Sequence, residues 1–286
     1  MDENYFDSNP LSKFTQVYFI LPILLTIIIA ILLAQFTISI QPNSSLTLFD
    51  STDEFFIILN IFFIIVISIV SLFIFFRLFK KTRELAVRIL VATFIMSGIL
   101  ATLLFTKLMF TTLELEFPLI LIVAAIVTYI GAYFGYLVIV DNISNKTRNT
   151  LFVICSGVLG SFFGVLVPTF AIILSLLFLS IVDVYLIKKR TVEKVFGEIA
   201  YEKMMTEITF SNKNWGIGIG DLTCYSIVVS NTAINFGFLL GIVSLLLILI
   251  GSFLSLKITF RSGRLPGLPI SIILGLIPAI IHLCLM

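Results

Sequence analysis

The chain has 286 residues, of which 59% are hydrophobic and only 12% are charged, and its mean hydropathy is +1.18. A soluble domain carries about 25% charged residues, so this chain has too few polar side chains to cover a surface in water. The net charge of +2 favours neither nucleic acid nor an acidic partner. The composition therefore predicts an all-α membrane protein, with the lipid bilayer as its main partner and no separate soluble domain.

Nine apolar runs are long enough to cross a bilayer as helices, which takes about 17–25 residues. In chain order they are Val17–Ile38, Phe55–Phe76, Ala86–Phe105, Phe117–Val140, Leu151–Val167, Phe170–Ile187, Gly216–Ile234, Phe236–Leu256 and Leu268–Leu285. The first run follows acidic residues and is long enough to span, so we expect it to be retained rather than cleaved as a signal peptide. The boundary between the seventh and eighth runs depends on turn signals around Asn235-Phe236-Gly237.

The positions of the basic residues test this division of the chain. In membrane proteins lysine and arginine collect in the cytoplasmic loops. With nine spans, every lysine and arginine except Lys107 falls on one side of the membrane. A miscounted helix would disturb this alternation. We therefore predict nine transmembrane helices, with the N-terminus in the cytoplasm and the C-terminus outside.

Two acidic residues stand apart from the other fourteen, which lie in the N-terminal tail, in loops or at helix ends. Asp183 and Asp221 lie well within apolar runs, where a charged carboxylate costs several kcal/mol, so each is a functional candidate. Asp183 is five residues before Lys188, roughly 7–8 Å from the inner end of its helix, and Asp221 is six residues after Trp215, roughly 9 Å from the same boundary. The predicted topology thus places both carboxyl groups at matching depth.

Two carboxyl groups that face each other away from water cannot both ionise easily, so such a pair shares one proton. The ionised member can then act as a general base on a water molecule, while the protonated member polarises a peptide carbonyl. This is the chemistry of an aspartic protease, and it needs no metal or cofactor. His282 is the only histidine, and no HExxH motif is present, so we expect no zinc site.

Two backbone signals accompany the aspartates. Asp221 ends the run Gly216-Ile217-Gly218-Ile219-Gly220-Asp221, and glycines allow another backbone to approach closely. Pro266-Gly267-Leu268-Pro269 opens the ninth run, and its two prolines interrupt regular helix and leave backbone groups unpaired. Both segments lie on the predicted cytoplasmic side. We expect Gly218, Gly220 and residues 266–269 to contact a substrate.

These motifs resemble those of the presenilin and signal peptide peptidase group of intramembrane aspartyl proteases, including its archaeal homologues. Gly218-Ile219-Gly220-Asp221 is similar to the GxGD motif on the seventh helix of that family, and Pro266–Pro269 is similar to its PALP motif. Asp183 stands where the family has its other catalytic aspartate. Val182 departs from the tyrosine usual before that aspartate, and Gly267 departs from the alanine usual in PALP.

The resemblance implies a GxGD-type aspartic endopeptidase that cleaves transmembrane helices within the membrane, with Asp183 and Asp221 as the catalytic pair. Residues 1–167 would form a scaffold of helices one to five, and residues 168–286 a catalytic part of helices six to nine. The latter includes a cytoplasmic loop at 188–215, in which we expect a short amphipathic helix. We expect a multi-pass protein of the cell membrane; homo-oligomerisation is left open.

Two alternatives remain open from the sequence. A proton- or cation-coupled transporter could use the same two aspartates as an ion relay, with Gly and Pro breaks marking its binding site. Prepilin peptidases also carry a GxGD motif and typically recognise a substrate at the cytoplasmic membrane boundary. The segment Pro266–Pro269 favours the presenilin-like interpretation over that of a prepilin peptidase.

Overall fold

A computed structural model describes residues 13–40, 77, 82–112, 117–189, 204–212, 215–262 and 268–285. Five of the described helices are long and apolar enough to cross a membrane, and two shorter apolar helices accompany them, so the chain is a multi-pass membrane protein. The predicted span Phe55–Phe76 lies outside the described residues. The helices are α1 (Lys13–Ile40), α3 (Arg83–Thr112), α4 (Phe117–Ile139), α5 (Asn145–Leu166), α6 (Thr169–Lys189), α9 (Ile219–Phe236), α10 (Phe238–Ser262) and α11 (Leu268–Leu285).

Local sequence signals explain where several of these helices begin and end. Ser144 caps α5, because its side-chain oxygen accepts a hydrogen bond from the Thr147 N–H at 3.1 Å. Pro168 separates α5 from α6, as a residue without a backbone donor interrupts a helix. Gly237 has a φ of 100°, a conformation that glycine adopts without strain, and it ends α9. The predicted boundary between the seventh and eighth runs is therefore confirmed.

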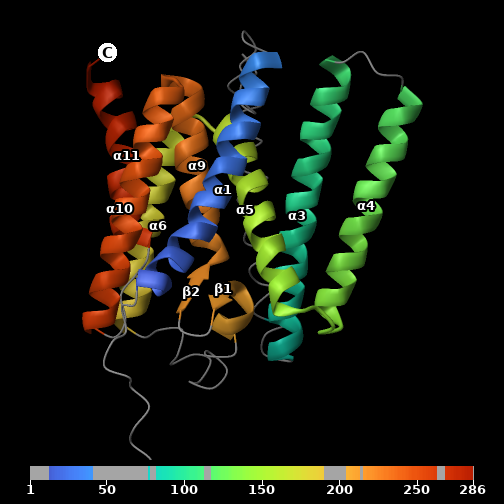
Figure 1. The fold of residues 1–286 in the computed structure, drawn as a ribbon, viewed down its shortest axis with the longest axis horizontal. Helices are drawn as coiled ribbons and strands as arrows, with labels where there is room; N and C mark the ends of the chain where they lie inside the picture. The colour runs from blue at the N-terminus through green and yellow to red at the C-terminus, as the bar shows by residue number, and fades with distance from the viewer. Residues whose placement is uncertain are drawn as a thin grey trace, which may run out of the picture.

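The helices stand side by side; α1 and α3 run in the same direction, and from α3 onward each described helix runs opposite to the one before it (Figure 1). The α3–α4 pair occupies one edge of the molecule, and α10 and α11 occupy the other. Between them lies α9, which packs against α1, α5, α6, α10 and α11. The alternation agrees with the predicted topology; the count of nine spans and the sidedness of the termini stay predictions.

A short hairpin precedes α9. Strand β1 (Thr209–Asn212) pairs antiparallel with β2 (Trp215–Gly218), with Thr209 opposite Gly218. We had expected helix from Gly216, but α9 begins three residues later, because Gly216 and Gly218 are poor helix formers and belong to the strand. Residues 204–208 form one helical turn. The rest of the predicted amphipathic helix, up to residue 203, lies outside the described residues.

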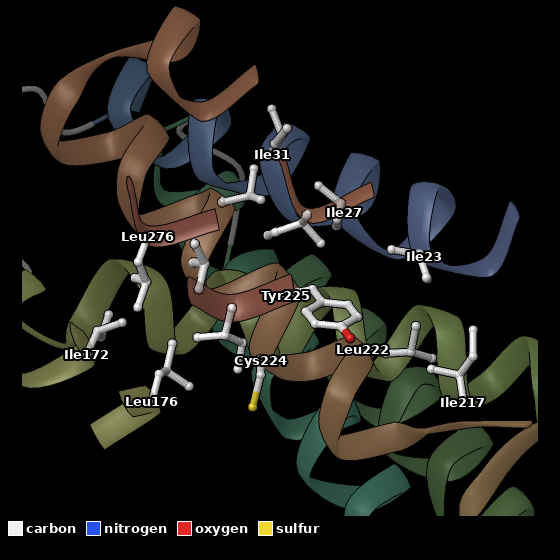
Figure 2. Close-up of a cluster of buried hydrophobic side chains, with 14 of the residues drawn as sticks. Ile23, Ile27, Ile31, Ile172, Leu176, Ile217, Leu222, Cys224, Tyr225 and Leu276 are labelled. Atoms are coloured by element: carbon white, nitrogen blue, oxygen red, sulfur yellow. The ribbon is translucent and has the colours of Figure 1, made fainter. Parts of the chain in front are cut away.

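The largest group of buried side chains gathers around α9. It joins residues of α1, α6, α9, α10 and α11 with Ile217 of β2, and Figure 2 shows part of it, including Ile27, Leu222, Tyr225 and Leu276. By contrast, large apolar side chains such as Leu32, Leu100, Phe178 and Leu239 are more than half exposed, and they suit contact with lipid. The core thus surrounds α9, whose third residue is Asp221.

Candidate active site

Asp221 occupies the third position of α9, directly after the hairpin. Gly218 is the N-cap residue of this helix, and its backbone N–H donates a hydrogen bond to the Asp221 carboxyl group. This is the reciprocal half of a capping box, in which an acid at the third helical position reaches back to the N-cap N–H. The bond fixes Asp221 at the junction between strand and helix, with its carboxyl group half-buried.

Asp183 approaches the same place from α6. Its side chain is also half-buried, and its charge acts on the carboxyl group of Asp221. Helix α6 packs against both α9 and α11. Two residues separated by 38 positions in the chain therefore interact from adjacent helices; their role as a catalytic pair stays a prediction.

The two glycines of the motif differ in what surrounds them. A Cβ atom at Gly218 would lie 3.4 Å from Cγ and from Oδ2 of Asp221, whereas a Cβ at Gly220 would have no heavy atom within 4 Å. Gly216 faces the opposite strand, where a Cβ would lie 3.0 Å from Oγ1 of Thr209. Gly218 therefore leaves room beside the carboxyl group, Gly216 allows the strands to approach, and the surroundings of Gly220 impose no such limit.

The proline-containing segment is described only in part. Pro266 and Gly267 lie outside the described residues. Leu268 is the first residue of α11 and Pro269 the second, where proline fits because the first helical N–H groups have no partner within the helix. Whether residues 266–269 contact a substrate stays a prediction.

Two further residues belong to this site, and sequence reasoning missed both. The charges of Asp183 and Asp221 act on Cys224 and on Tyr225, so the four side chains form one cluster. Tyr225 follows Asp221 by one helical turn, a spacing that places both on the same face of α9. That i, i+4 spacing was readable from the sequence.

Helix α5 holds the hairpin from the outside of the site. The Asn149 side-chain amide donates through Nδ2 to the Ser211 carbonyl at 2.8 Å and accepts at Oδ1 from the Ser211 N–H at 3.3 Å. Arg148 donates to the Thr206 carbonyl at 3.1 Å. One turn of α5 thereby fixes the chain just before and within β1.

No group of three or more potential metal ligands occurs among the described residues. The cluster instead offers two carboxyl groups, a thiol and a phenol in an otherwise apolar core. Such a set can bind and move protons.

The fold has a counterpart among solved structures. The chain is similar to a structure described as a presenilin family intramembrane aspartate protease, with a TM-score of 0.57 and 14% sequence identity over 95% of this chain and 99% of that chain. No family model and no curated protein matches the sequence. The chain has the fold of a presenilin family protease, as its motifs predicted.

Proposed function

We propose that this chain is an intramembrane aspartyl protease of the GxGD type, which hydrolyses peptide bonds within transmembrane helices at Asp183 and Asp221. The observation that carries the proposal is the electrostatic interaction between these two carboxyl groups, which lie on adjacent helices of a presenilin-like fold. An isolated aspartate at the start of a helix could serve only as a cap. A second aspartate beside it, within α6, is costly in a membrane, and that cost calls for a function.

In the proposed reaction the two carboxyl groups share one proton. The ionised group removes a proton from a water molecule, and this water attacks the carbonyl carbon of the scissile bond. The protonated group donates a hydrogen bond to the carbonyl oxygen, where negative charge develops. When the tetrahedral intermediate collapses, the C–N bond breaks and the leaving amine takes the proton that the ionised group had removed from water. The two carboxyl groups thus carry the whole proton transfer.

A helical substrate must be unwound locally before water can reach its carbonyl groups. The hairpin supports a way of holding the unwound segment: the outer side of β1 bonds to Asn149 of α5, so the outer edge of β2 is the place where a peptide could pair. An extended peptide can add to such an edge as a further strand. Strand β2 leads directly into Gly218 and Asp221, so a peptide on the hairpin would lie close to both carboxyl groups.

The decisive experiment is cleavage of a single-span reporter helix by the purified protein. It is measured both in detergent and in liposomes made from cell-membrane lipids. Asp183→Asn and Asp221→Asn should each lower kcat by on the order of 10³-fold or more, as expected when one member of a catalytic set is removed. Asp141→Asn is the matched control, since Asp141 is an exposed helix-end acid whose Oδ2 lies 2.6 Å from Arg88. Its activity should equal that of the wild type.

Three other outcomes would overturn the proposal or narrow it. Full activity in either Asn variant would refute the two-aspartate mechanism. Ion flux in sealed vesicles without cleavage of any reporter would indicate a coupled transporter. A cut at the cytoplasmic boundary rather than within the span, mapped by mass spectrometry, would indicate an activity similar to that of prepilin peptidases.

The two motif glycines give a second test of the same site. Gly218→Val should abolish most activity, because a branched side chain there would press on the Asp221 carboxyl group. Gly220→Ala should retain activity, because its Cβ would meet no heavy atom within 4 Å. Equal effects of the two substitutions in the cleavage assay would show that Gly218 does not shape the site.

A further inference from the structure

Tyr225 is the largest polar side chain buried beside the two aspartates. It is 2% exposed and belongs to the core formed by α1, α6, α9, α10 and α11. Figure 2 shows its ring among apolar side chains, beside Leu222, with the phenol oxygen at its tip. The hydroxyl group therefore needs an explanation, because a buried polar group costs free energy unless it is hydrogen-bonded.

The Tyr225 hydroxyl has a partner on α11. It shares a hydrogen bond with the hydroxyl of Ser271, which is fully buried, and either hydroxyl can act as the donor. Ser271 is the fourth residue of α11, directly after the proline-containing start of that helix. The bond joins the first turn of α11 to the turn of α9 that follows Asp221.

Ser271 is itself held in place by α10. A Cβ atom at Gly251 would lie 2.6 Å from the Ser271 Cα and 3.1 Å from the Ile270 carbonyl oxygen, so the backbones of α10 and α11 meet at this point. Because the backbones of α10 and α11 are in contact here, Ser271 has little freedom to move relative to α10. A hydrogen bond to Ser271 therefore holds its partner, Tyr225, in a fixed position relative to α10 and α11.

Tyr225 also interacts electrostatically with both aspartates. The charge of Asp221 acts on its phenol group more strongly than does the charge of Asp183. The spacing of four residues places Tyr225 on the Asp221 face of α9. The pair Tyr225–Ser271 thus joins α9, which begins within the glycine–aspartate run, to α11, whose second residue is Pro269.

We propose that Tyr225 is a positioning residue for the reaction, whose hydrogen bond to Ser271 fixes the first turns of α9 against α11 and so sets the place of the Asp221 carboxyl group relative to Asp183. The inference rests on the proposed protease function. It assigns neither residue a contact with the substrate. Its effect should appear in kcat and only weakly in KM, because it changes the alignment of the reacting groups and not the substrate contacts.

The test is a double-mutant cycle with Tyr225→Phe, Ser271→Ala and the double variant in the reporter cleavage assay. We expect each single variant to lose about tenfold in kcat with KM changed by less than about twofold, and the double variant to lose no more than either single one. Such non-additivity shows that both residues act through one bond. Ser271→Ala measures the same bond from the other side if Tyr225→Phe does not purify as a folded protein.

Ser244→Ala is the matched control. Ser244 is also a fully buried serine that joins α10 to α11, through a 2.9 Å hydrogen bond from its hydroxyl to the Gly275 carbonyl, one turn farther along α11. Ser244→Ala should lower the unfolding temperature as much as Ser271→Ala does, but it should leave kcat unchanged. If Ser244→Ala and Ser271→Ala lose equal amounts of kcat, the bond from Tyr225 to Ser271 contributes no more to the reaction than any buried hydrogen bond does. That result would overturn the inference.

The remaining outcomes separate this inference from the proposed function. If the wild type cleaves the reporter and Tyr225→Phe does so at the same rate, the inference fails and the two-aspartate proposal stands. If the two single effects multiply in the double variant, Tyr225 and Ser271 act independently, and the inference also fails. If the wild type cleaves no reporter helix, the proposed function and this inference fall together.

Discussion

Helices α4 and α5 follow each other in the chain, yet they differ sharply in how much of each is buried. In the apolar stretch of α4, 17% of the residues are buried, against 56% in α5. The more buried helix is the less apolar of the two. Lipid solvates apolar side chains as well as a protein core does, so burial in a membrane is not driven by hydrophobicity.

Small residues make the difference. The buried face of α5 carries Ser156, Gly157, Gly160, Ser161 and Gly164, and it packs against α1 and α9. Gly157 faces the Thr26 carbonyl of α1, and Gly160 faces Ser226 of α9. Helix α4 packs chiefly on α3 and leaves Tyr129, Tyr133 and Tyr136 exposed. Close backbone approach therefore selects the helices that support the site.

The largest effect should come from filling the α5–α9 contact. Gly160→Ala would place a Cβ against the Ser226 Cβ and 3.0 Å from its carbonyl carbon, so α9 must shift. Overpacking of this kind costs about 1–3 kcal/mol in unfolding free energy. The control is Gly135→Ala on α4, whose nearest neighbour would be the Met96 Sδ at 3.5 Å. It should be neutral or stabilising by up to about 1 kcal/mol, since alanine is the better helix former.

Unfolding in mixed micelles of increasing SDS content measures both variants. If Gly160→Ala and Gly135→Ala change stability alike, close backbone approach does not distinguish α5 from α4. Cleavage should fall with Gly160→Ala, because Ser226 is five residues after Asp221 on the helix that must move.

A smaller effect is expected from the polar bonds across the same interface. Asn231 of α9 is 2% exposed and donates through Nδ2 to the Gly164 carbonyl at 2.9 Å and to the Val167 carbonyl at 3.3 Å. Asn231→Leu should destabilise the protein by about 1 kcal/mol, in the range measured for hydrogen bonds between membrane helices. Thr128→Val on α4 removes a bond only to its own helix, from Oγ1 to the Ala124 carbonyl, and should be close to neutral.

The same denaturation series compares the two variants. A stability loss in Thr128→Val as large as that in Asn231→Leu would mean that bonds within one helix count as much as bonds between helices here.

The sequence predicted what depends on local pattern. Apolar length located the ends of the described helices to within four residues, because a span must match the bilayer. The exceptions are α3, which ends seven residues later than predicted, α5, which begins six residues earlier, and α10, which ends six residues later. Asp183 and Asp221 stood out because charge is costly in lipid, and Pro168 and Gly237 marked helix ends. Each of these signals is contained in one short stretch of chain.

What the sequence did not reveal depends on contacts between distant segments. The hairpin was missed because its strands, Thr209–Asn212 and Trp215–Gly218, are only four residues each. Its support also comes from a distant segment, since Asn149 of α5 bonds to Ser211. The bond from Tyr225 to Ser271 was missed because the two residues are 46 positions apart. No periodicity in one sequence specifies which turn of α11 meets which turn of α9.

The smallest change in stability should come from Asn149→Ala, and it tests whether α5 serves the site as well as the fold. The variant loses both bonds to Ser211, at 2.8 and 3.3 Å, near a partly exposed end of the helix. Because water can replace these bonds in part, we expect less than about 1 kcal/mol of lost stability. Cleavage should nevertheless fall severalfold, because β1 would no longer be fixed beside β2 and Asp221. Asn142→Ala, at an exposed asparagine between α4 and α5, should leave both quantities unchanged. If Asn149→Ala cleaves the reporter as fast as Asn142→Ala does, the hairpin needs no support from α5, and the role of this helix ends with packing.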